Sequence, residues 1–316
     1  MHELTITRHN PAIDPTLHIW GWEISLYLFL GGLIAGMMMI TGFFLSRQRF
    51  KEATCTCALV PLLSVVLLSI GMLALFLDLS HKLYVWRMYA TFKPASPMSW
   101  GSWILLLVYP ALIGAFLVRP PMYLTKRFAA LRRWSAKLHT HPSRIRAVGI
   151  LNMVLGAMLG IYTGILLSGF GARPLWNSPI LAPLFLISGL STAAALVHLF
   201  ARDRDESEML AKADNTFLTA ELVSVVLLII GLISSTKVHI QAAQLLLTGD
   251  YAPVFWVLVI GMGIIIPLII QSLAVRHKVA HMPIAPIMVI IGGLILRFVI
   301  VEAGQVSHWT RAALLP

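Results

Sequence analysis

The chain has 316 residues, of which 58% are hydrophobic and 12% are charged. Soluble domains carry about 25% charged residues, so this composition excludes a soluble protein and indicates an integral membrane protein. The formal net charge is +11. Because basic residues of membrane proteins gather in loops beside anionic lipid, we expect this charge to face membrane lipid and we expect no nucleic-acid binding.

Eight segments are long and apolar enough to cross the roughly 30 Å hydrocarbon core as helices. They are expected at about 18–45, 56–80, 99–118, 145–168, 179–200, 215–237, 253–275 and 284–303. No cleavable signal precedes the first span, so the N-terminus is expected to be retained. We predict an all-α integral membrane protein with an N-terminal tail (1–17), a bundle of eight transmembrane helices (18–303) and a C-terminal tail (304–316).

The Lys and Arg residues predict the direction of the bundle. Sixteen of them fall in one set of loops, and seven fall on the side that includes both tails. Loops that face the cytoplasm carry the excess of basic residues. Both termini are therefore expected on the extracytoplasmic side of a bacterial inner membrane.

The first two spans carry ionisable residues near the end that the tails occupy. Glu23 lies about 7 Å inside the first span by the 1.5 Å rise per residue, and Tyr27 shares its face one turn further on. Asp78 lies near the end of the second span, and His81 follows it. A charged group at mid-depth in a bilayer costs about 2–3 kcal/mol or more, so such residues point to function with a partner nearby.

Three connecting segments have distinctive compositions. Residues 80–103 are rich in aromatic residues and proline, and we expect them to fold over helix ends or under a partner. Residues 122–141 place basic residues at helical spacing among Leu, Phe and Trp, which fits a helix on the membrane surface or a merely basic loop. The mixed-charge segment 202–214 is expected to be a solvated connector.

Small residues recur inside two spans at a spacing of four. Gly32 and Gly36 lie in the first span, and Gly156, Gly160 and Gly164 lie in the fourth. This spacing is typical of membrane helices whose backbones approach closely, and we assign it no chemistry.

The last span carries charged residues within an apolar run. Arg297 and Glu302 are five positions apart, which turns them away from each other on a helix, and Gln305 follows. Arg297 is therefore expected to find its carboxylate on another helix. Asp78 and Glu23, at comparable depth, are the candidates.

The polar residues near the tail side indicate a pocket for an amphipathic ligand in apolar surroundings. A quinone fits, because its carbonyls need hydrogen-bond donors and its redox chemistry needs a proton acceptor or donor. An ion-pair network that only holds helices together is the alternative. On the opposite half, Asn152 and Glu221 fit either the start of a proton path or hydrogen bonds between helices.

The histidines exclude one class of redox protein. A membrane cytochrome b needs axial histidines well inside its helices. All eleven histidines of this protein fall at span ends, in loops or in the N-terminal tail. We predict no haem, and no metal-binding motif is present.

Several stretches, in order along nearly the whole chain, resemble the NrfD/polysulfide-reductase membrane-subunit family. They are "WGWEISLYLFLGGLIAG" (20–36), "DLSHKLYVW" (78–86), "SPMSWGSW" (96–103), "GIYTGILLSG" (160–169), "PLWNSPILAPLFLISGLSTAAA" (174–195), "AEL" (220–222) and "LRFVIVEAGQ" (296–305).

The resemblance implies a haem-free subunit of an oxidoreductase of anaerobic respiration that binds menaquinone or ubiquinone near the outer surface. The implied partners are an extracytoplasmic four-cluster iron–sulfur subunit and a catalytic molybdopterin or multihaem cytochrome subunit. Asp78, Arg297 and Gln305 stand at family-like positions. Some members carry Asn and His where this sequence has Ile24 and Tyr27, and a tyrosine can also donate to a quinone carbonyl.

We therefore expect a quinone-interacting membrane subunit that exchanges electrons with a docked partner and that, alone, does no more than bind quinone. Proton exchange is assigned to Glu23, Asp78 and His81, and quinone binding to Tyr27, Arg297, Glu302 and Gln305. The alternatives are an ion-coupled secondary transporter, which would need a polar site at mid-depth, and a purely structural membrane anchor.

Overall fold

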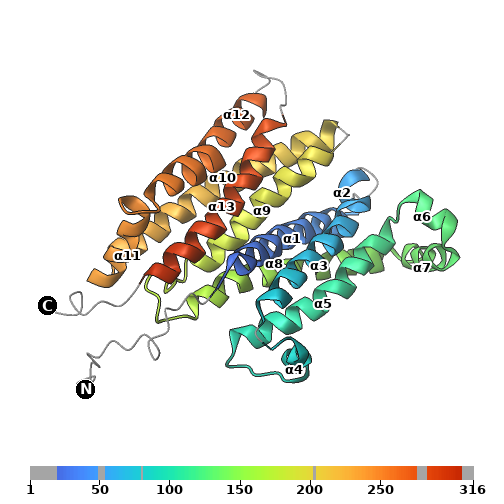
Figure 1. Cartoon of the computed structure of the whole chain (residues 1–316). Coiled ribbons are helices and arrows are strands. Elements are labelled where there is room, and N and C mark those ends of the chain that lie inside the picture. Colours follow the sequence, from blue (N-terminus) through green and yellow to red (C-terminus); the bar gives the residue numbers. More distant parts are fainter. Residues whose placement is uncertain (1–19, 49–53, 80, 202–203, 276–282, 308–316) are drawn as a thin grey trace.

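The computed structural model describes residues 20–48, 54–79, 81–201, 204–275 and 283–307 (Figure 1). Eight helices there are long and apolar enough to cross a membrane, which confirms the eight predicted spans. They are α1 (Trp22–Ser46), α3 (Val60–Asp78), α5 (Pro97–Val118), α8 (Pro142–Ser168), α9 (Leu181–Phe200), α10 (Arg204–Ile233), η2 (Val254–Ile265) continued by α12 (Ile266–Val275), and α13 (Ile284–Val306).

Shorter helices connect these spans. They are α2 (Thr54–Ala58), η1 (Lys82–Tyr84), α4 (Trp86–Ala90), α6 (Met122–Arg127), α7 (Ala129–His139) and α11 (Lys237–Leu247). No strand occurs in the residue ranges described above. An all-helical fold satisfies every backbone group within a span internally, as a bilayer requires.

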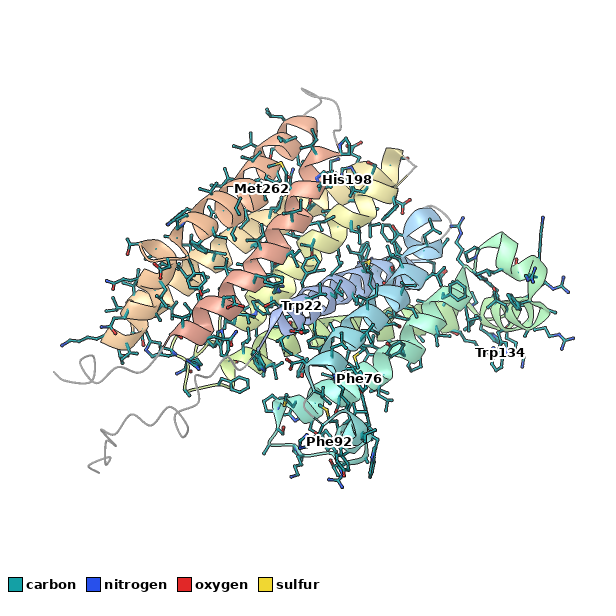
Figure 2. The ribbon with its side chains drawn as sticks, viewed as in Figure 1. Trp22, Phe76, Phe92, Trp134, His198 and Met262 are labelled. Carbon is teal, nitrogen blue, oxygen red and sulfur yellow. The ribbon has the colours of Figure 1, made fainter. Side chains whose placement is uncertain are left out.

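The outer faces of the long helices are apolar. Leu73, Ile113 and Val257 are 56%, 50% and 63% exposed on α3, α5 and η2. The side chains drawn in Figure 2 cover the long helices mostly with carbon. Such faces suit lipid, whereas water would favour polar side chains at these positions.

The long helices form two groups of four. Helices α1, α3, α5 and α8 pack on one another, and α9, α10, η2–α12 and α13 form the second group. Helix α1 joins the groups, because it also packs on α9 and α13. The described residues begin and end at the same end of the bundle, which we call the tail end, and α6 and α7 lie at the opposite end, which we call the basic end (Figure 1).

Glycines allow the closest helix contacts, as their spacing predicted. A Cβ added at Gly36 would overlap the carbonyl oxygen of Gly189 on α9, and one at Gly156 would press on the carbonyl of Ala35. A Cβ at Gly164 would overlap the backbone of Ala182. Glycine at these positions lets α1, α8 and α9 pack backbone to backbone.

The prediction of a solvated connector at 202–214 is wrong for its described part. Helix α10 begins at Arg204 and not near 215. Glu206 and Asp214 are 3% and 0% exposed, because both carboxylates accept hydrogen bonds from other helices. Local composition suggested solvent exposure, but tertiary hydrogen bonds place one face of this segment inside the bundle.

The two unusual loops fold as short helices. Residues 81–92 form η1 and α4 across the ends of α3 and α5, which confirms that this segment folds over helix ends. Residues 122–139 form α6 and α7, joined at Phe128, and α7 packs on α5 and α8. The helical form of this segment is confirmed, and its position on a membrane surface stays a prediction.

Candidate functional site

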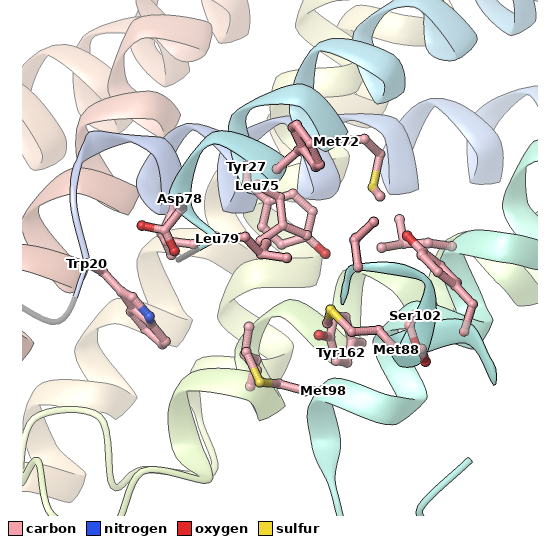
Figure 3. Close-up of a pocket in the computed structure, with 16 residues that line it drawn as sticks. Trp20, Tyr27, Met72, Leu75, Asp78, Leu79, Met88, Met98, Ser102 and Tyr162 are labelled. Carbon is pink, nitrogen blue, oxygen red and sulfur yellow. The ribbon is translucent and has the colours of Figure 1, made fainter. Parts of the chain in front are cut away.

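A cavity of about 650 Å³ lies between α1, α3, α5 and α8 at the tail end. Small-molecule sites occupy roughly 300–1,000 Å³, so the cavity has the size of a ligand site. Figure 3 shows its lining. The lining residues are Trp20, Ile24, Tyr27, Met72, Leu75, Phe76, Asp78, Leu79, Val85, Met88, Tyr89, Met98, Ser102, Leu105, Tyr162 and Leu166.

Two tyrosine hydroxyls meet deep in this cavity. Tyr27 of α1 and Tyr162 of α8 are 3% and 6% exposed, and their two side chains act on each other. Gly101 makes room for this pair, because a Cβ there would overlap the Tyr162 ring. A phenol donates one hydrogen and accepts others, so the pair can turn a donor toward a ligand carbonyl.

One wall of the cavity comes from α4 and the residue before it. Tyr89 of α4 lines the cavity, and burial raises the pKa of this tyrosine, with neighbouring Tyr109 adding to the effect. Its hydroxyl is therefore protonated at neutral pH. Ser102 of α5 is 4% exposed and donates to Met88 O at 2.9 Å and Ser99 O at 2.8 Å, which ties α4 to the start of α5.

Asp78 is the carboxylate of the cavity. It ends α3, is only partly exposed, and feels the charge of Glu23 on α1. Asp78 also borders a second hollow of about 660 Å³, which is lined by His81 and Lys82 among others. Of the predicted residues, Asp78 lines both hollows and His81 lines the second, whereas Glu23 lines neither and acts on Asp78 through its charge.

Gln305 holds one wall of the cavity in place. Its side-chain amide donates to Trp20 O at 2.9 Å and accepts from Trp20 N at 3.1 Å. The Trp20 ring stacks on Trp176 at 5.2 Å between centroids and meets Phe170 edge-on at 5.1 Å. Gln305 itself is not among the lining residues, so its contact with the cavity runs through Trp20.

Arg297 does not pair with Asp78 or Glu23, so that expectation is corrected. Its Nη2 donates to Phe185 O at 2.8 Å, and its guanidinium lies 3.8 Å from the centroid of the Phe185 ring. The charge that acts on it is Glu221 of α10. The side chain lies near the middle of α13, beside Phe185 of α9 and Gly32 of α1, and Arg297 is not among the residues that line the cavity.

Glu302 also lies away from the cavity. Its charge acts on Tyr251, in the segment before η2, where burial and then the Glu302 and Asp250 charges raise the pKa of the tyrosine. Among the described residues, no group of three or more His, Cys, Asp or Glu could hold a metal ion.

Residues 8–308 match the family described as Polysulphide reductase, NrfD. The protein belongs to the NrfD family. It is 29% identical to a polysulfide reductase chain of Wolinella succinogenes, over 91% of this sequence and 94% of that protein. It is 27% identical to the protein NrfD of Escherichia coli, over 92% and 96% of the two sequences, and 29% identical to a tetrathionate reductase subunit of Salmonella typhimurium, over 83% and 71%.

These matches confirm the family resemblance found in the sequence. Together with the eight apolar helices, they identify a multi-pass membrane protein of the NrfD family. The similarity covers both groups of helices, because the matched range begins before α1 and ends after α13.

This NrfD-family protein also buries carboxylates in its second group of helices. Asp214 accepts from Ser191 Oγ at 2.9 Å and from Gln271 Nε2 at 2.7 Å. Glu221 lies seven residues further along α10, on the same face, and is 3% exposed. Asn152 lies elsewhere, on α8, and its amide donates to Ala111 O at 3.0 Å and Val148 O at 2.9 Å.

Several residues of the site were not predicted from the sequence. Tyr162 and Tyr89 line the cavity, but nothing in one sequence says which face of α8 or α4 meets α1. The buried acid Asp214 did leave a signal, since Glu206, Asp214 and Glu221 recur at spacings of eight and seven residues. That spacing of two helical turns could have identified a buried polar face.

Proposed function

We propose that this protein is the quinone-interacting membrane subunit of a reductase complex and that it binds menaquinol or ubiquinol in the cavity at the tail end. The cavity itself is the main support for this proposal. Apolar walls for an isoprenoid tail surround two tyrosine hydroxyls, and Asp78 stands at the mouth. Relatives named as parts of polysulfide and tetrathionate reductases support assembly with a catalytic partner.

The cavity residues fit a quinone. A quinol supplies two electrons and two protons when it is oxidised. The Tyr27–Tyr162 pair can hold a carbonyl or hydroxyl of the ring, and Asp78 can accept a proton and pass it to the outer hollow that it shares with His81. Glu23 would take part through its charge, which acts on Asp78.

The proposed electron partner is an extracytoplasmic four-cluster iron–sulfur subunit, which would exchange electrons with a molybdopterin or multihaem cytochrome subunit. The surface beside the cavity supports docking there. Leu83, Trp86 and Phe92 are 89%, 58% and 56% exposed, while Val85 and Met88 of the same segment line the cavity. An exposed apolar patch of this kind is typical of a protein interface. Here the patch and the wall of the cavity belong to the same short segment of the chain.

We also propose how the bundle is oriented in the membrane. We infer that the tail end faces away from the cytoplasm of a bacterial inner membrane, because the basic end carries most Lys and Arg residues. The quinone cavity and the docking segment would then share the extracytoplasmic side.

The deciding experiment is quinol-dependent reduction of the iron–sulfur subunit in the purified complex, with Asp78→Asn compared with the unchanged protein. Loss of a general base typically costs about 100-fold or more in rate, and that loss is expected here. Asp250→Asn is the matched control, because Asp250 is an exposed acid at the same end outside the cavity. Full activity of an assembled Asp78→Asn complex would favour the structural-anchor alternative.

We further propose that the buried acids of α10 conduct protons from the basic end toward middle depth. Asp214 and Glu221 share one face of the helix, with Arg297 beside Glu221. Asn152, which bonds to the backbones of α5 and α8, would contribute only if its unpaired Oδ1 takes part.

The proton path has a separate test. The complex is reconstituted in vesicles, and protons moved per electron are measured for Glu221→Gln. A lower ratio with continuing electron transfer is expected, whereas an unchanged ratio would restrict Glu221 to its interaction with Arg297. Solute uptake by the isolated membrane protein in such vesicles would instead favour the ion-coupled transporter.

A further inference from the structure

The surface of α6 and α7 at the basic end has no role in the quinone site. The segment from Arg119 to Arg146 holds eight Lys and Arg residues and no acidic residue. Arg132, Arg133 and Lys137 of α7 are all exposed. A helix with this much unbalanced positive charge needs anions near it when it lies at a membrane.

Helix α7 is amphipathic and fixed to the bundle by its apolar side. Leu131 and Leu138 are half-buried, and Leu138 packs against the hydrophobic core. His139 at the end of the helix is hydrogen-bonded to Val118 O, the last residue of α5, at 2.8 Å. This contact places α7 at the level where α5 ends, which is the level of a membrane interface.

Aromatic side chains stand among the exposed charges. Trp134 is 60% exposed, and Lys137 Nζ lies 5.2 Å from its ring centroid. Phe128, between α6 and α7, is 53% exposed. Figure 2 shows Trp134 on the part of the molecule that projects farthest from the bundle at the basic end. Exposed Trp beside Lys and Arg is typical of residues that sit among lipid headgroups.

We propose that α7, with the end of α6, forms a binding surface for anionic phospholipid headgroups through Arg132, Arg133 and Lys137, with Trp134 inserted at the interface. Lipid is favoured over an acidic protein because the aromatic residues lie at the depth where the spans end. The proposal stands independently of quinone binding.

The test is native mass spectrometry of the purified full-length protein in detergent, titrated with phosphatidylglycerol or with phosphatidylcholine. Each basic residue near anionic lipid strengthens binding by about fivefold. We therefore expect the triple variant Arg132→Gln, Arg133→Gln, Lys137→Gln to bind phosphatidylglycerol at least tenfold more weakly, with phosphatidylcholine binding unchanged. Inorganic phosphate at millimolar concentration should not compete if lipid, and not free phosphate, is the ligand.

A matched triple variant at the tail end, Lys82→Gln, Arg87→Gln, Lys93→Gln, removes the same charge from exposed positions. It should leave phosphatidylglycerol binding intact. Equal loss in both triple variants would overturn the proposal, since net charge alone would then explain binding. Unchanged binding in the α7 variant would also overturn it and would leave an acidic protein as the occupant of this surface. Thermal unfolding of each variant confirms that the fold is retained.

Discussion

Gln305 and Trp20 are 285 positions apart in the sequence, yet the side chain of one is bonded twice to the backbone of the other. This pair closes the bundle, because it joins the end of α13 to the start of α1. It also assigns Gln305 a role that differs from direct ligand binding. The amide uses one N–H and its carbonyl oxygen to bind Trp20, and Trp20 lines the cavity whereas Gln305 does not.

Replacing Gln305 by Leu should therefore weaken quinol binding through Trp20. The change keeps the side-chain volume and leaves two buried backbone groups unpaired, at about 1–3 kcal/mol each. We expect a raised KM for quinol in the assembled complex with a smaller change in kcat. In a Trp20→Ala background, Gln305→Leu should add little further effect, whereas fully additive effects would indicate that Gln305 contacts the quinone itself.

Tyr27→Phe and Tyr162→Phe each remove one hydroxyl of the buried pair without changing the ring. A hydrogen bond contributes about 0.5–1.5 kcal/mol, so kcat/KM for quinol should fall by up to roughly tenfold in each variant. Tyr109→Phe serves as the control, because Tyr109 contacts Ser69 Oγ outside the cavity. If Tyr27→Phe and Tyr162→Phe have the same kcat/KM for quinol as the Tyr109→Phe control, then the tyrosine pair does not touch the ligand.

Hydropathy was sufficient for the eight spans, because a bilayer demands long apolar helices whatever their neighbours. It failed at the start of α10, where Asp214 reads as a solvated residue but lies between Ser191 and Gln271. The depth and type of Glu23, Tyr27 and Asp78 pointed to the site. Tyr162 and Tyr89 could not be predicted, because their contribution depends on which faces of separate helices meet.

Arg297 illustrates the same limit. Its burial inside an apolar span was evident in the sequence, but its neighbours were not. Phe185 accepts a hydrogen bond through its carbonyl and stacks its ring on the guanidinium, and Glu221 supplies the opposite charge. Only the packing of α9 against both α13 and α10 brings these groups together.

Removing one member of this pair should cost more than removing both. Arg297→Leu removes the positive charge that acts on Glu221 and leaves that acid buried, so the single variant should unfold at a lower temperature than the unchanged protein. The double variant Arg297→Leu, Glu221→Gln should recover much of that loss, because no buried charge remains. Thermal unfolding of the purified protein measures both. A double variant as unstable as Arg297→Leu would show that Phe185, and not Glu221, is the partner that matters.

The junction between the two groups of helices offers the last prediction. Gly36 of α1 faces the backbone of Gly189 on α9, and a methyl group there would overlap the Gly189 carbonyl. Gly36→Ala should therefore force α1 and α9 apart and destabilise the protein by about 1–3 kcal/mol.

Gly231→Ala is the matched control for this change. Gly231 also lies within a long helix, but an added Cβ there meets no atom within 4 Å. Helix propensity favours alanine over glycine by up to about 1 kcal/mol, so this variant should be unchanged or slightly more stable. Thermal unfolding in detergent compares the two. If Gly36→Ala unfolds at the same temperature as Gly231→Ala, then α1 and α9 do not pack backbone to backbone in the membrane protein, and the junction that orders the cavity wall of α1 must be held by other contacts.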